Sequence, residues 1–285
     1  MAIYMWREML NYLCFTGGMA NSTIQLTKTW SPTAVVLETS TDWANWSTYT
    51  IWSTITLSTW DKVYFRNSST TDTWFSINGA NLYKFVMSWV VTVSWDVNFL
   101  LNKNSTNTVP DYCFNQLFMD FWWLFSNIKL PATTLWNYCY VNMFRWAYSL
   151  STMPELPATS LSNSCYQFMF MSCTNLTSLS NLPATTLWDS SYVGMFRWCT
   201  NLEQLPKLPA TTISNWWYQQ MFYGCSKIKL SSTQTWEYQT AYRIPTTWTW
   251  SAISNSFQSM FASTWWTFTS DPTVNTTYYT SNTLV

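Results

Sequence analysis

The 285-residue chain contains no histidine, only 5 glycines, and charged side chains at only 9% of its positions. The absence of histidine excludes Ser-His-Asp and Cys-His nucleophilic sites, the HExxH zinc site and acid–base catalysis by imidazole. The 13 basic and 13 acidic residues cancel. The chain therefore lacks the net positive charge that would point to nucleic acid or to an anionic membrane as a partner.

Membrane and export signals are also lacking. No apolar run reaches the roughly 18 residues of a transmembrane helix. The segment from Met1 to Phe15 carries Arg7 and Glu8 within its apolar stretch, and it lacks the residue order of a secretory signal peptide. The 7 cysteines, an odd number, give no closed disulfide framework.

A repeat of 26 residues is the strongest feature of the chain. LPATTL at Leu130–Leu135 returns as LPATSL at Leu156–Leu161, LPATTL at Leu182–Leu187 and LPATTI at Leu208–Ile213. A period of about 20–29 residues with recurring leucines predicts a leucine-rich-repeat solenoid of short strands and short helical turns. In each repeat we expect a strand equivalent to Leu150–Met153 and a helical turn equivalent to Tyr138–Ala147.

Apolar residues of the repeat fall into columns that stacked coils would bury. The columns are Leu150, Leu176, Leu202 and Ile228; Met153, Leu179 and Leu205; Leu156, Leu182 and Leu208; and Phe144, Phe170, Phe196 and Phe222. Cysteines form two further columns, which fit either a metal or redox ladder or buried thiols that pack as small apolar residues. Ala147, Ser191 and Trp217 interrupt those columns and favour buried thiols.

Residues 12 to about 100 lack the period and read as short strands separated by turns. The predicted strands are Ser22–Thr27, Ala34–Glu38, Ser47–Ile51, Thr54–Leu57, Lys62–Arg66, Tyr83–Met87 and Val90–Ser94. They predict a small all-β sandwich or barrel. We therefore divide the chain into an all-β domain (1–101), the repeat solenoid (102–246) and a C-terminal cap (247–285).

The motif CYxxMFxxC, followed by an LxxL pair and LPATTL, resembles the BspA-type leucine-rich-repeat surface proteins of bacteria. It appears here as Cys165-Tyr166, Met169-Phe170, Cys173, Leu176, Leu179 and Leu182–Leu187. The stretch from Ser40 to Asn67 is similar to the β-domain that often precedes such repeats. The resemblance implies a cell-surface or secreted binding protein, in some cases an adhesin, and no catalytic residues. Because similar cassettes occur in phage-encoded proteins, a virion or host-recognition component is the alternative.

Tryptophan stands where the resembling family has glycine. The chain has 22 Trp against 5 Gly, whereas about 20 Gly are usual at this length. Trp43, Trp52, Trp60, Trp146 and Trp198 occupy such positions. Column 146, 172, 198 and 224 reads Trp, Ser, Trp, Gly, and column 136, 162, 188 and 214 reads Trp, Ser, Trp, Ser, which predicts tight turns in both. Either UGA codons for glycine were translated as Trp, or the tryptophans form an aromatic surface for glycans or peptides.

The polar residues between the strand leucines are the candidates for ligand contact, because solenoids bind along such an extended face. They are Thr177, Ser178, Glu203 and Gln204. Glu155 and Glu203 fall in different columns, which does not fit the carboxylate pair of a glycosidase. We therefore expect a non-enzymatic binding or adhesion protein, with no cofactor and no metal, whose partner is a host or cell-surface protein or glycan. The alternative is that these polar residues are only the solvated surface of a structural solenoid.

Overall fold

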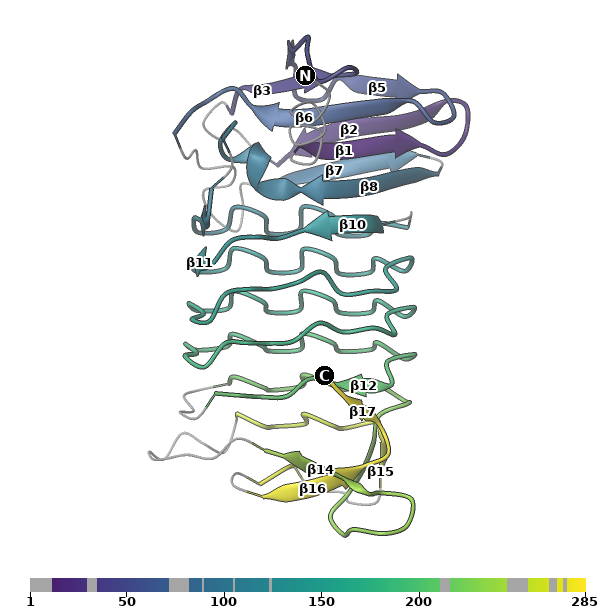
Figure 1. Ribbon diagram of the computed structural model, residues 1–285, viewed down its shortest axis with the longest axis vertical. Helices are drawn as coiled ribbons and strands as arrows, with labels where there is room; N and C mark the ends of the chain where they lie inside the picture. Colours follow the sequence, from purple (N-terminus) through teal and green to yellow (C-terminus); the bar gives the residue numbers. More distant parts are fainter. Residues whose placement is uncertain are drawn as a thin grey trace, which may run out of the picture.

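A computed structural model describes residues 12–29, 35–71, 82–88, 90–104, 106–122, 125–210, 216–244, 256–266, 271–273 and 276–285. The molecule is elongated, with two β-sheets at one end followed by a stack of coils (Figure 1). Strands dominate, and within the described ranges the only helix is the short 3-10 helix η1 (Val97–Leu100). The prediction of a β-rich protein is confirmed.

The N-terminal part holds two sheets, a six-stranded one of order β10-β8-β1-β6-β3-β4 and a three-stranded one of order β5-β2-β7. Their strands are β1 (Leu13–Gly17), β2 (Ser22–Lys28), β3 (Leu37–Ser40), β4 (Ser47–Tyr49), β5 (Thr54–Leu57), β6 (Lys62–Asn67), β7 (Tyr83–Ser88), β8 (Val91–Asp96) and β10 (Phe125–Lys129). Each of the seven predicted strands overlaps one of β2–β8, although Ala34 lies outside the described residues. Strand β1 is not among the predicted ones.

The two sheets pack face to face through aromatic rings. Phe15 of β1 lies 4.7 Å from Phe85 of β7, and Phe65 of β6 lies 5.4 Å from Phe85, between ring centroids. All three side chains are buried. This is a sandwich, and the described strands close no barrel, so of the two predicted architectures the barrel is wrong.

Below the sandwich, each 26-residue repeat forms one coil, and main-chain hydrogen bonds join each coil to the next (Figure 1). Parallel bridges pair Thr152 with Ser178 and Ser160 with Thr186, which are equivalent positions of consecutive repeats. Short strands continue the stack, namely β9 (Thr108–Val109), β11 (Thr134–Leu135), β12 (Gln204–Leu205) and β13 (Lys229–Ser231). The predicted strand at Leu150–Met153 is a single bridge at Thr152.

The predicted helical turn at Tyr138–Ala147 is wrong. Tyr138, Asn142 and Trp146 have φ of 58°, 54° and 61°, in the left-handed region that a right-handed helix cannot contain. The segment is a run of consecutive turns closed by bonds such as that from Met143 N to Tyr140 O, 3.2 Å. The intervening amides donate to the next coil, as Tyr140 N does to Cys165 O at 3.1 Å. The run therefore pairs its amides both within its own coil and with the next one.

The residues of the predicted apolar columns are buried, except Leu208, which is half-buried, and this confirms the inward-facing positions of the others. Phe144, Phe170, Phe196 and Phe222 are 0% exposed and stack at centroid separations of 5.5, 5.8 and 5.7 Å. A second column stacks beside it and contains Phe114, Tyr140, Tyr166, Tyr192, Tyr218 and Phe257. Continuous ring stacks of this kind couple each coil to both neighbours.

The seven cysteines are free and buried. The thiols of Cys173 and Cys199 donate to the carbonyls of Phe144 and Phe170, at 3.0 and 3.1 Å. Burial raises the pKa of both thiols. The side chains thus pack as small apolar residues with a weak hydrogen bond to the preceding coil.

Beyond the regular coils lie β14 (Thr240–Arg243), β15 (Trp265–Trp266), β16 (Thr277–Thr280) and β17 (Thr283–Leu284). At the other end of the stack, β10 pairs in parallel with β8, so one sheet runs across the predicted boundary between residues 101 and 102. The predicted boundary at 246–247 lies outside the described residues. The division into three parts stays a prediction.

All five tryptophans at glycine-like positions have a left-handed backbone, with φ of 52° at Trp43, 74° at Trp52, 71° at Trp60, 61° at Trp146 and 63° at Trp198. Ser172 and Gly224, which share the column of Trp146 and Trp198, have φ of 61° and 74°. The predicted tight turn in this column is confirmed. In the other column, Trp136 and Trp188 do not adopt positive φ and are exposed, so their backbone does not require glycine. Trp188 still begins a turn, because its carbonyl accepts from Ser191 N at 3.3 Å.

Candidate binding face

The four predicted contact residues lie in two consecutive coils, on a row of extended segments that we call the strand face. This face comprises β10, 150–153, 176–179, 202–205 and β13. Thr177 and Glu203 are exposed, and Ser178 and Gln204 are half-buried. In both coils the two leucines are buried and the two polar residues between them face outward, as the positions in the repeat predicted.

The backbone at Thr177 and Ser178 is fixed by the preceding coil. The amides of both residues donate to the Ser151 carbonyl, at 3.0 and 3.1 Å, and the Ser178 carbonyl accepts from Met153 N at 2.8 Å. Thr177 Oγ1 also donates to Ser151 O at 3.3 Å. The strand face is therefore rigid here, which lowers the entropy that binding would cost.

Glu203 and Gln204 have partners within the chain. Glu203 Oε1 pairs with Lys227 Nζ at 2.7 Å, and this hydrogen bond holds the pKa of the carboxyl below its usual value. Gln204 Oε1 accepts from Leu179 N at 2.7 Å and so joins two coils. Of the four predicted residues, Gln204 thus has a structural contact, and Glu203 presents an exposed ion pair.

A hollow on the strand face that was not predicted lies one coil earlier. It is a groove of about 820 Å³ between β10 and the segment from Leu150 to Pro154. A second hollow of about 560 Å³ lies around Glu203, Lys227, Lys229 and Asn282. The position of Ser151 and Thr152 between Leu150 and Met153 could have indicated that they face outward, but nothing in the sequence marks a gap beside β10.

The chemistry of the face is that of contact. Glu155 lines the first groove and Glu203 the second, so the two carboxylates do not form one site. Within the part of the chain that the structure describes, no three His, Cys, Asp or Glu side chains could hold a metal ion. What the face offers is backbone amides, hydroxyls and an apolar floor.

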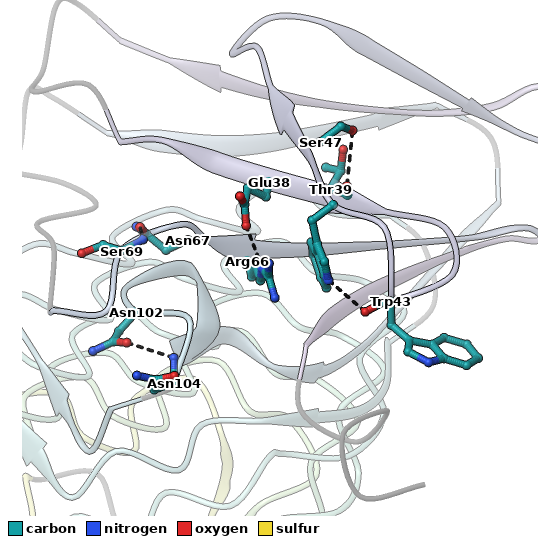
Figure 2. A network of polar contacts seen from close by, with 10 residues as sticks. Glu38, Thr39, Trp43, Ser47, Arg66, Asn67, Ser69, Asn102 and Asn104 are labelled. Carbon is teal, nitrogen blue, oxygen red and sulfur yellow. Dashed lines mark hydrogen bonds and ion pairs between the residues drawn. The ribbon is translucent and has the colours of Figure 1, made fainter. Parts of the chain in front are cut away.

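A separate polar cluster lies in the sandwich, around Arg66 (Figure 2). Its Nε pairs with Glu38 Oε2 at 2.8 Å, and its guanidinium lies 3.9 Å from the centroid of the Trp46 ring. Trp46 Nε1 in turn donates to the Trp43 carbonyl at 2.8 Å. These contacts hold the loop between β3 and β4 against β6, which is a structural role.

Comparison with models of protein families, with characterised proteins and with solved structures finds no significant match. Among the described residues, no helix has the length and apolar character that crossing a membrane requires. The assignment of function therefore depends on the strand face itself.

Proposed function

We propose that the chain is a non-enzymatic binding protein, exposed on a cell surface or secreted, that attaches to a protein or glycan through its strand face. The observation that carries the proposal is the groove of about 820 Å³ on this face. Ile128, Leu150 and Met153 give it a buried apolar floor, and the exposed Ser151 and Thr152 give it polar walls. An apolar floor with a few fixed polar groups is typical of binding sites.

The stacked coils support an adhesive use. Each coil is joined to its neighbours by ring stacks and main-chain hydrogen bonds, so the face is extended and stiff. Repeats of this type present such faces to their partners. The 26-residue period and the buried leucine columns also support placing the chain with BspA-type leucine-rich-repeat proteins.

Binding of the full chain to immobilised cell-surface glycoproteins and to glycan arrays would test the proposal. Thr177→Arg puts a long charged side chain on the strand face and is expected to weaken binding about tenfold or more. The matched control is Thr185→Arg, the same change at an exposed residue of the same repeat but outside the strand face. Equal binding by the two variants, or no binding by the unmodified chain, would contradict the proposal.

A further inference from the structure

The groove beside β10 exists because β10 is bent away from the next coil. The pairing of β10 with β8 shifts register between Phe125 and Ile128, and Asn127 within this bulge has φ of 54°. A bulge bends a strand and increases its twist. Across the described residues, no hydrogen bond joins β10 to the segment 150–154.

The facing segment turns an unused strand edge toward the groove. The Ser151 carbonyl and the Met153 amide bond to the following coil, at Ser178. Peptide groups of successive residues in an extended strand point to opposite sides. The amide and carbonyl of Thr152 therefore face β10 across the groove, and no hydrogen bond of theirs is present in the described structure.

The chain itself shows what such a gap accepts. Two coils further on, its own C-terminal segment lies between the strands of consecutive coils, with β17 paired to β12 and β16 paired to β13. The Asn282 side chain bonds to both coils, because Nδ2 donates to Glu203 O at 2.8 Å and Lys227 O at 3.1 Å while Oδ1 accepts from Lys229 N at 2.7 Å. The inserted sequence, Thr280 to Val285, has uncharged side chains, and a bend at Ser281 and Asn282 joins β16 to β17.

We propose that the groove between β10 and Ser151–Pro154 binds an extended peptide segment of a partner protein by strand addition. The inference rests on the proposed binding function and names its ligand class. The peptide backbone bonds to the peptide group of Thr152, as β17 bonds to β12. Alternate side chains enter the apolar floor, and the others, which are small and polar, face the rim.

The probe is a decapeptide selected on the full chain from a random displayed library and then synthesised with a fluorescent label. Its dissociation constant is measured by anisotropy for the unmodified chain and for Thr152→Pro, which lacks the amide donor. We expect about tenfold weaker binding, the value of one good hydrogen bond. Thr185→Arg should bind normally. A control that does not depend on the folding of Thr152→Pro uses the unmodified chain. The same peptide is made in two forms, N-methylated at its odd or at its even residues, and one of the two forms should bind more weakly than the parent peptide.

The results separate this inference from the proposed function. Failure to select any peptide, or equal affinity for both N-methylated forms and the parent peptide, would overturn strand addition. So would a glycan that binds the chain and displaces the peptide from the groove. If the chain still adheres to cell-surface glycoproteins while the peptide does not compete, strand addition is wrong and the proposed function stands.

A second inference rests on the backbone alone. Besides the five tryptophans named above, Trp95 has φ of 79°. Trp216 also has positive φ, 65°, but its column holds Tyr112 and Tyr138 at 58°, so the backbone there does not point to glycine. A bulky residue with positive φ is a marked outlier, whereas glycine adopts this region freely. We infer that glycine is the natural residue at positions 43, 52, 60, 95, 146 and 198, and that UGA codons for glycine stand at these places in the gene.

Trp46 is the internal control. Its φ is not positive, and its ring carries the Arg66 guanidinium and donates to Trp43 O, so a true tryptophan is expected there. The gene should show UGA at the six positions and UGG at position 46, and mass spectrometry of the native protein should read glycine at the six. UGG codons at the six positions, or tryptophan in the native peptides, would overturn the inference.

Discussion

The indole of Trp198 fills the space beside Gly224, its equivalent in the next coil. A Cβ placed on Gly224 would lie 2.4 Å from Trp198 Cε3, and φ is positive at both residues, 63° and 74°. The position of the Trp198 indole therefore leaves no room for a side chain at Gly224, although Ser172 follows Trp146 in the same column. Such a close contact is expected where a tryptophan replaces one small residue in a column of small residues.

Replacing Trp60 by glycine should stabilise the protein. Trp60 has φ of 71° and is 78% exposed, so little packing is lost, and its amide bond to Gly17 O is kept. Relief of the left-handed strain should raise the free energy of unfolding by about 1 kcal/mol. The matched control is Trp236→Gly, since Trp236 is also exposed but has no positive φ. A stabilisation shared by both variants in urea unfolding would argue against backbone strain.

Replacing any of three buried tyrosines by phenylalanine should not destabilise the protein and should in part stabilise it. The hydroxyls of Tyr140, Tyr192 and Tyr218 are buried and have no hydrogen-bond partner among the residues that the structure describes, and burial raises the pKa of all three. Their column accepts phenylalanine at Phe114 and Phe257. Each Tyr→Phe change should therefore be neutral or stabilise by about 1 kcal/mol.

Tyr242 provides the contrast, because its hydroxyl donates to Pro206 O at 3.2 Å. Tyr242→Phe should cost about 1 kcal/mol in the same thermal or chemical unfolding measurement. If Tyr140→Phe and Tyr242→Phe lowered the free energy of unfolding equally, the buried hydroxyls of the tyrosine column would have hydrogen-bond partners after all.

The repeat period was enough to predict which residues face inward. Leu176 and Phe196 both recur at 26-residue spacing, and both are buried. The turn conformation was not predictable in the same way. Tyr138 carries no marker of positive φ, and Asn142, a residue type that tolerates it, is replaced by Phe168 and Gln220 in equivalent positions. The groove escaped prediction since it depends on a bulge at Asn127 and on the absence of a paired strand. The insertion of the C-terminal strand β17 beside β12 is a long-range contact that no local pattern encodes.

The loop after β3 should make the free energy of unfolding fall at acidic pH. The Asp42 carboxylate accepts from the amides of Ala44 and Asn45, at 3.0 and 2.8 Å, and from Asn45 Nδ2 and Ser40 Oγ, at 2.7 and 2.9 Å. These bonds, led by those of Asn45, hold the pKa of Asp42 well below its usual value. The unfolded chain therefore takes up the proton first. The stabilisation is complete above the unfolded pKa of about 3.9 and falls as the pH drops toward the folded value.

Asp42→Asn should remove this part of the acid dependence. Urea midpoints of the variant and the unmodified chain should converge as the pH falls from about 5 to about 2.5, and the Asp42 carboxyl should titrate low by NMR. A constant difference between the two proteins over this range would mean that the four hydrogen bonds do not form in solution.

In the phenylalanine column, a change to alanine at the centre should destabilise the protein more than the same change near the end. Phe196 is 0% exposed and stacks on Phe170 and Phe222 at 5.8 and 5.7 Å, so Phe196→Ala should cost about 3–5 kcal/mol. Phe261 stacks on Phe222 at 5.3 Å near the C-terminal end of the column, and Phe261→Ala should cost less. Chemical denaturation of the full chain compares the two.

Amide hydrogen exchange should then show how far the Phe196→Ala defect spreads. Coupling in a stack of repeats passes mainly between neighbours, so protection should fall most at the amides of Phe170 and Phe196. The stack nevertheless continues through Phe144 and Phe118 to Phe85 in the sandwich, and β10 pairs with β8 there. Protection in β1 should therefore decline slightly but persist. Equal loss in β1 and beside Phe196 would show that the sandwich and the coils unfold as one unit.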